Sequence, residues 1–184
     1  MNSEELLQLI ATRRSSVLID AAQPVDVKVI HEMITAAQWA PNHKKTWPAR
    51  FVIVSGDSRS RLGHAIADAM AQQGDDATKV EKTRAKYLRS PFVIVVASAE
   101  GSTPMEHEEN KYAVAAGIQN MLLIAHSHQL ASLWSSPAKG ANSAITKFSG
   151  LDPSDTVLGI IYVGYPSKVA PDSDRPTPRV IELS

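Results

Sequence analysis

Three runs of aliphatic residues constrain the fold of this 184-residue chain most strongly. They read RFVIVS at 50–55, PFVIVVAS at 91–98 and TVLGIIYVG at 156–164. A strand with one face in water alternates apolar and polar residues, whereas continuous Val and Ile indicate a strand buried on both faces. The sheet therefore needs a layer of helices on each side, which predicts an α/β fold.

Segments between these runs have the spacing and capping residues of helices. Asp26 is a good N-cap for a helix that Pro41 would end, and Ser3 with the acids after it marks an earlier helix start. Further helices are predicted at about 58–73, 75–88, 106–128 and 142–148, and a short strand at 131–134. No linker or repeat divides the chain, so residues 1–184 are interpreted as one domain.

Two features suggest a homodimer. The predicted helix at 106–128 is apolar nearly all round, so it must be buried, either in the centre of one subunit or at an interface. The Pro-rich tail from 167 ends in RVIEL, a strand-like segment that a partner chain could pair with.

Composition excludes several classes of function. Lys plus Arg and Asp plus Glu both number 19, so no basic excess favours nucleic acid. There is no cysteine, which excludes thiolate metal sites and a cysteine nucleophile. The six histidines form no metal-binding pattern, and no dinucleotide, P-loop or serine-hydrolase motif occurs. The start MNSEELLQLI is not a signal peptide and no run spans a bilayer, so a cytoplasmic location is expected.

Four polar segments could bind a ligand, and each also has a plain structural explanation. TRRSS at 12–16 is either an anion cradle or a solvated helix end. WAPNHKKTWPAR at 39–50 and LWSSP at 133–137 are either ligand loops or turns. KVEKTRAKYLR at 79–89 could reach a phosphate with a lysine or form a solvated helix face.

Taken in order, these segments resemble the nitroreductase family of flavoproteins, in particular its small members with an APxHK loop. The resemblance rests on RRSS, APNHKKTWPARFVIV, the helix–strand unit QNMLLIAHSHQLASLW, LGIIYVGYP and the Pro/Arg tail, and it runs from about residue 4 to 182. It implies an α+β sandwich with a central mixed sheet, in an obligate homodimer that exchanges its C-terminal strands. It also implies FMN at the dimer interface and NADH or NADPH as electron donor.

The implied activity is a ping-pong reaction in which FMN passes electrons to nitroaromatics, quinones or related small acceptors. The alternative is a flavin store or sensor of the same fold with little reductase activity. FMN itself would carry the chemistry, so no catalytic side chain and no metal are expected.

The resemblance also implies roles for individual residues. Arg13, Arg14 and Ser15 match the segment that holds the FMN phosphate and ribityl chain, and Trp39 and His43 match the loop that reaches the partner's flavin. Trp134, Ser135 and Ser136 match the segment along the isoalloxazine ring. The remaining candidates are Asn120 or Gln119 on the central helix, and Lys82, Lys86, Arg175 or Arg179 for the phosphate.

This chain departs from the larger members of that family in one loop. They often carry Ser-x-x-Asn-x-Gln-Pro-Trp there, whereas NHKKTWPAR has no Gln-Pro-Trp and Trp47 precedes the proline. Their long insertion between central helices is absent, which predicts a more open active site.

Overall fold

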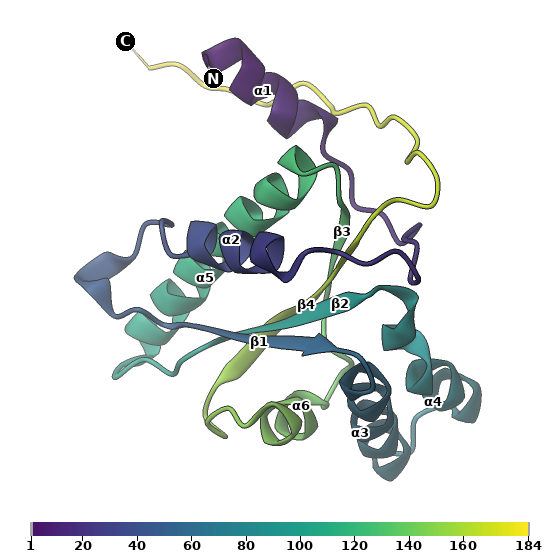
Figure 1. Cartoon of the computed structure of the whole chain (residues 1–184). Coiled ribbons are helices and arrows are strands. Elements are labelled where there is room, and N and C mark those ends of the chain that lie inside the picture. The colour runs from purple at the N-terminus through teal and green to yellow at the C-terminus, as the bar shows by residue number, and fades with distance from the viewer. Residues whose placement is uncertain (1, 184) are drawn as a thin grey trace.

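The computed structural model describes residues 2–183, and its helices and strands lie between Ser3 and Gly164 (Figure 1). The helices are α1 (Ser3–Thr12), α2 (Val27–Ala37), α3 (Ser58–Gln72), α4 (Ala77–Arg84), α5 (Pro104–Ser127) and α6 (Asn142–Ser149), with 3-10 turns η1 (His43–Lys45) and η2 (Lys86–Arg89). The strands are β1 (Ala49–Ser55), β2 (Phe92–Ser98), β3 (Ala131–Ser135) and β4 (Thr156–Gly164).

The four strands form one sheet in the order β1-β2-β4-β3. All three strand pairs are antiparallel, so the expectation of a mixed sheet is wrong for the named strands of one protomer. Parallel pairing among the described residues is limited to an isolated bridge between Ser15 and Ser132. The physical reason is that continuous Val and Ile runs report burial on both faces, which depends on the covering helices and not on strand direction.

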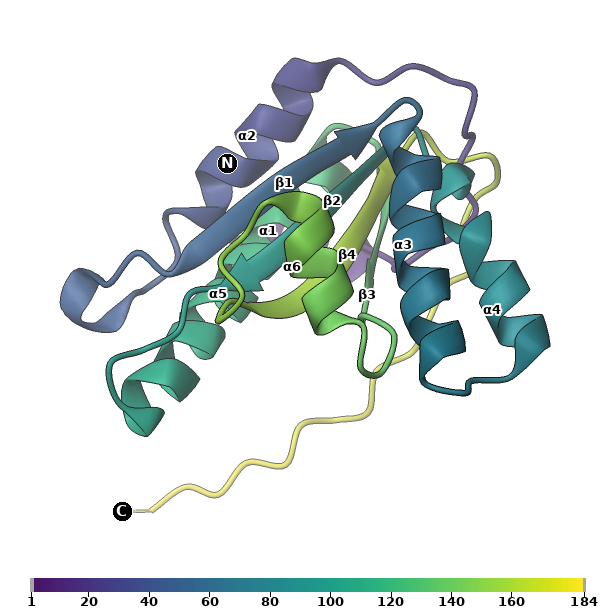
Figure 2. The ribbon, with the colours of Figure 1, turned by 90° about the horizontal axis from the view of Figure 1, so that it is seen from below.

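Helices cover both faces of the sheet, as the sequence predicts. In Figure 1, α2 and α5 lie above the sheet, and α3, α4 and α6 lie below it; Figure 2 shows the second layer from below. Each face of the sheet packs against its helices in a separate hydrophobic core, and successive residues of β2 point to the two faces in turn. Val93 and Val95 face α3 and α6, and Ile94 and Val96 face α2 and α5. Burying both sets stabilises the sheet by about 1.5–3 kcal/mol for each large side chain.

Helix α5 is the central helix of the upper layer. Seven of its residues are buried, and Gly117 lets it approach α2 so closely that an added Cβ would lie 2.9 Å from the Ala37 carbonyl oxygen. Helix α1 begins at Ser3, as predicted, and its N-cap Asn2 exchanges hydrogen bonds with Glu5 in a capping box. Asp26 caps α2 as predicted.

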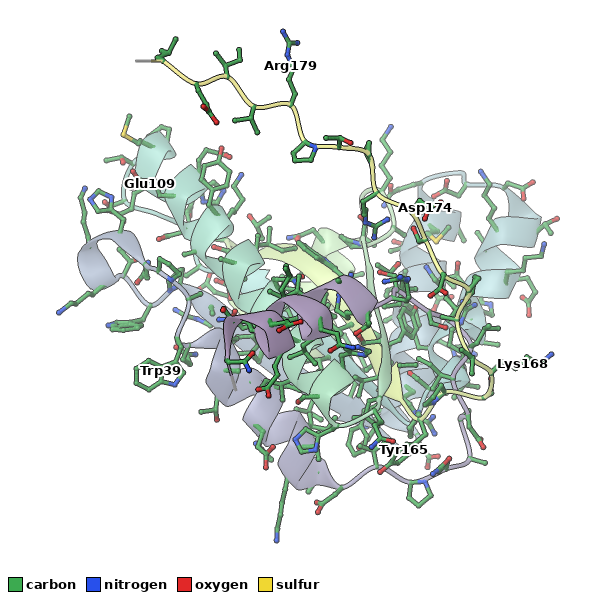
Figure 3. The ribbon with its side chains drawn as sticks, turned by 90° about the horizontal axis from the view of Figure 1, so that it is seen from above. Trp39, Glu109, Tyr165, Lys168, Asp174 and Arg179 are labelled. Carbon is green, nitrogen blue, oxygen red and sulfur yellow. The ribbon has the colours of Figure 1, made fainter. Side chains whose placement is uncertain are left out.

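The tail beyond β4 has no regular structure in the described part of one protomer. RVIEL, predicted as a strand, is extended away from the body in Figures 2 and 3, and Val180, Ile181 and Leu183 are exposed. Exchange of this segment between subunits therefore stays a prediction. Among residues 2–183, no helix is both long and apolar enough to cross a membrane.

Candidate functional site

Two arginines project from the segment that follows α1. The Arg14 guanidinium donates to the carbonyls of Ala11 and Arg13 at 2.5 and 3.0 Å, which anchors it to the last turn of the helix. Its other end lies 3.7 Å from the exposed carboxylate of Asp172, in the tail segment that crosses this region. Arg175 of the same tail lines a hollow with Arg14, so three arginines meet here.

These arginines carry unused hydrogen-bond donors. Arg13 Nη1 and Arg14 Nε are buried and have no hydrogen-bond partner among residues 2–183. Burial lowers the pKa of Arg13, and the charges of Arg175 and Arg14 lower it further. Buried donors without acceptors and cations that repel one another are both costly. An anion with several oxygens, such as a phosphate, would offset both costs.

A histidine that the sequence did not single out stands beside this group. His126, near the end of α5, has Nε2 3.0 Å from the hydroxyl of Thr12. Burial lowers the pKa of His126, followed by the positive charges of Arg13 and Arg14. A cavity of about 350 Å³ opens here between α5, the start of β3 and residues 166–172. Arg13 and Arg14 thus disfavour a positive charge on His126.

The arginine segment continues directly onto the edge strand of the sheet. The Ser16 N–H donates to the carbonyl of Ser132 at 3.0 Å, and Ser15 forms the parallel bridge with Ser132. Ser135 lies three residues further along β3, which is about 10 Å at the usual rise of a strand. Arg13 and Arg14 thus lie near the start of β3, and the polar residues Ser135 and Ser136 lie at its other end.

The loop between α2 and β1 is held by side-chain hydrogen bonds. Asn42 Oδ1 accepts from the Trp47 N–H at 2.8 Å, and Asn42 Nδ2 donates to the Thr46 hydroxyl at 3.0 Å. The Thr46 hydroxyl donates to the buried Asn110 of α5 at 2.7 Å. His43 Nδ1 lies 2.8 Å from the Glu109 carboxylate, which ties the loop to the same helix.

This loop has an unusual backbone. Lys44, Lys45 and Trp47 adopt φ values of 57°, 55° and 49°, in the left-handed region that L residues rarely occupy. Such strain persists only where other contacts impose it and is concentrated at functional sites. The loop presents its tryptophans to solvent, since Trp39 is 82% and Trp47 55% exposed.

We expect Asn42→Ala to release this loop without unfolding the domain. The lost hydrogen bonds should lower the free energy of unfolding by about 1–2 kcal/mol. Amide hydrogen exchange of residues 43–47 should speed up, while β2 and α5 stay protected. Asn42→Asp is the matched control because it keeps the acceptor for the Trp47 N–H, and it should retain most of the protection. Equal protection in the alanine variant would contradict the role given to Asn42.

Within one protomer, the two groups of candidate residues lie at opposite ends of α5. Glu109, which contacts His43, and His126, which lies beside Arg13, are 17 residues apart, or about 26 Å along the helix axis. In Figure 3, Trp39 and Glu109 lie on one side of the molecule, and Lys168 and Asp174 of the tail lie on the other. One protomer therefore does not bring the loop to the arginines.

The remaining candidates are placed in different ways. The Asn120 side chain donates to the carbonyl of Ala36 at 3.1 Å, which ties α5 to α2, and Gln119 is exposed. Lys82 and Lys86 lie on α4 and η2, which Figure 1 shows on the far side of the sheet from α5. Arg179 projects from the extended tail in Figure 3. Arg175 instead lines the hollow beside Arg14. The flavin contacts expected of these residues stay predictions.

Other chemistry finds no support in the described part of the chain. No three His, Asp or Glu side chains of residues 2–183 converge as a metal ion would require. Acidic side chains do surround a hollow at the end of β2, but Asp152 and Asp155 bond there to backbone N–H groups of their own loop. Among these features, the arginines beside the start of β3 are best suited to holding an anionic ligand.

The chain is similar to known proteins over most of its length. Residues 10–165 match the sequence profile of the Nitroreductase family. YdjA of Escherichia coli, provisionally named an NAD(P)H nitroreductase, is 25% identical over 96% of this chain and 98% of its own. The crystal structure of a nitroreductase-like family protein from Bacillus cereus, 27% identical, superposes with a TM-score of 0.80 over 99% of this chain and 98% of that one.

A nitroreductase from Desulfovibrio desulfuricans in complex with FMN, provisionally named, has the same fold. It is 24% identical, with a TM-score of 0.74 over 96% of this chain and 93% of that one. Because the family profile covers most of the chain, this protein belongs to the nitroreductase family.

Proposed function

We propose that this protein is an FMN-dependent NAD(P)H oxidoreductase that works as a homodimer on small electron-poor acceptors. The observation that carries the proposal is the pair of buried, unpaired guanidinium nitrogens of Arg13 and Arg14 beside Arg175. Family membership and the FMN complex of a related fold support a flavin phosphate as the anion. The acceptors we infer are nitroaromatics and quinones, reduced in a ping-pong order.

In this proposal each segment of the chain has a distinct task. Arg13, Arg14 and Arg175 hold the phosphate by charge-assisted hydrogen bonds. Residues of β3 would contact the ribityl chain, and Ser135 and Ser136 would contact the ring. When bound, FMN supplies the redox chemistry by taking a hydride from NAD(P)H and passing electrons to the acceptor.

The dimer follows from the separation of the two groups of residues. The exposed Trp39 and His43 lie too far from the arginines of their own subunit to share a ligand with them, so we assign them to the flavin of the other subunit. Exposed apolar residues of α1 and of the tail support an interface, because contiguous apolar surface is costly in water. Light scattering after size-exclusion chromatography tests the dimer. A cytoplasmic location stays a prediction.

The decisive test of the activity is a stopped-flow experiment. The purified protein, reconstituted with FMN, is mixed with NADH or NADPH, and bleaching of the yellow flavin band is followed. We expect rapid bleaching, and recovery of the band when a quinone is added. A protein that does not bind FMN would refute the proposal. A yellow protein that neither nucleotide reduces would favour a flavin store or sensor.

A further inference from the structure

The indole of Trp134 lies across the neighbouring strand β4, on the side toward the end of β3. Trp134 pairs with Ile161, whose side chain belongs to the core under α2 and α5, and directly opposed residues of an antiparallel pair share a face. The Trp134 Nε1–H donates to the carbonyl of Leu158 at 3.1 Å. The ring thereby crosses β4 beside Gly159, and 39% of the residue stays exposed.

Gly159 provides the space for this ring. A Cβ at Gly159 would lie 2.1 Å from Trp134 Nε1 and 2.4 Å from its Cδ1, distances that real side chains do not adopt. The φ of Gly159 lies outside the left-handed region, so the backbone conformation does not require glycine there. It is the close approach of the indole that requires glycine at this position.

A β-bulge provides the acceptor for the indole N–H. Along the pairing of β2 with β4, Val96 pairs with Gly159 but Ala97 pairs with Val157, so Leu158 has no partner in this ladder. Bulges bend a strand, leave the extra residue out of the ladder and are common beside active sites. Here the extra residue is Leu158, and its carbonyl accepts the hydrogen bond from Trp134. The bulge and Gly159 together therefore fix the position of the indole.

We propose that Gly159 is a positioning residue for the flavin ring, acting through Trp134. The indole has one N–H, and Leu158 accepts it, so Trp134 does not donate to the flavin. The Ser135 hydroxyl donates to the carbonyl of Ser136 at 3.3 Å, so the side-chain donor left at this end of β3 is the hydroxyl of Ser136. In the register that pairs Trp134 with Ile161 and Ser135 with Ile160, Gly159 lies level with Ser136. The indole held on β4 therefore lies beside the end of β3 and borders the space where the ring is placed. This inference rests on the proposed function.

The first test follows Trp134 in the protein without flavin. In a Trp39→Phe, Trp47→Phe background, Trp134 is the remaining tryptophan, so its emission reports its own surroundings. Gly159→Ala should displace the indole, shift its emission to the red and increase its quenching by acrylamide. An unchanged emission spectrum and unchanged quenching would overturn the inference.

The second test measures the flavin. Gly159→Ala should weaken FMN binding by about tenfold and shift the visible absorption band of the bound flavin. If the effect passes through Trp134, the same substitution in a Trp134→Leu background should change the affinity by less than about twofold. A tenfold loss in both backgrounds would overturn the inference, because Gly159 would then act without the indole.

A third variant keeps the proposal testable if Gly159→Ala does not fold. Trp134→Phe keeps an aromatic ring but removes the N–H that Leu158 accepts. We expect FMN affinity about threefold weaker and a shifted flavin band, and unchanged values for both would contradict the proposal. Failure of the unmodified protein to bind FMN would instead refute the proposed function, while the emission test of flavin-free protein would still decide the position of Trp134.

Discussion

Replacing both Arg13 and Arg14 with alanine is expected to give a folded protein that purifies without FMN. Each charge-assisted hydrogen bond to the phosphate should contribute about 1.5–3 kcal/mol, so the double variant should bind FMN about 10²–10⁴-fold more weakly. Flavin absorbance per protomer measures the occupancy, and fluorescence titration measures the dissociation constant.

A matched control removes two cations elsewhere. Lys28 on α2 and Arg61 on α3 are both exposed, and Lys28→Ala with Arg61→Ala changes the net charge by the same amount. This control should keep full FMN occupancy. Full occupancy in the Arg13, Arg14 variant would show that the phosphate is held elsewhere.

The surroundings of Arg13 predict the sign of a stability change. Arg13 has a buried nitrogen without a partner and is repelled by Arg175 and Arg14. Arg13→Ala should therefore leave the unfolding temperature of the flavin-free protein unchanged or slightly higher, while FMN should stabilise this variant less than it stabilises the unmodified protein. If Arg13 served only the fold, Arg13→Ala would instead lower the unfolding temperature of the flavin-free protein, and FMN would stabilise the variant as much as the unmodified protein.

The strands and helices could be predicted from the sequence because local patterns determine them. The Val and Ile runs at 50–55, 91–98 and 156–164 all became strands, since continuous apolar residues in short runs rarely have another solution. Strand direction could not be predicted, because the same runs serve parallel and antiparallel sheets when helices cover both faces. The tail segment RVIEL has strand character, but a strand forms only where a partner edge is present.

The candidate site was predictable in its parts but not in its assembly. TRRSS and LWSSP each had a plain alternative. The bridge from Ser15 to Ser132, the residue before LWSSP, links distant parts of the chain. His126 gave no local signal, because its role depends on the arginines that the fold brings to it. Gly159 did give one, since an isolated glycine inside a strand is typical of a bulge or a close approach.

A mixed dimer tests whether each flavin site is built from two subunits. One chain carries Arg13→Ala and Arg14→Ala, and the other carries Trp39→Ala and His43→Ala. If the arginines and the loop of a site come from different subunits, one site of the mixed dimer combines all four substitutions and the other has none. We therefore expect one FMN per mixed dimer. It should bind with the affinity measured for the unmodified protein, and NAD(P)H should reduce it at the rate measured for the unmodified protein.

Two tags of different kinds allow the mixed dimer to be purified in successive steps after co-expression, with both homodimers as controls. If all four residues served the same subunit's flavin, the mixed dimer would contain one site without the arginines and one without the loop side chains. Its retained FMN would then show the affinity and reduction rate of the Trp39, His43 homodimer. That outcome would contradict a site shared between subunits. Recovery of one unmodified site instead requires that the His43 and the Arg13 that serve the same flavin belong to different chains, as their separation along α5 implies.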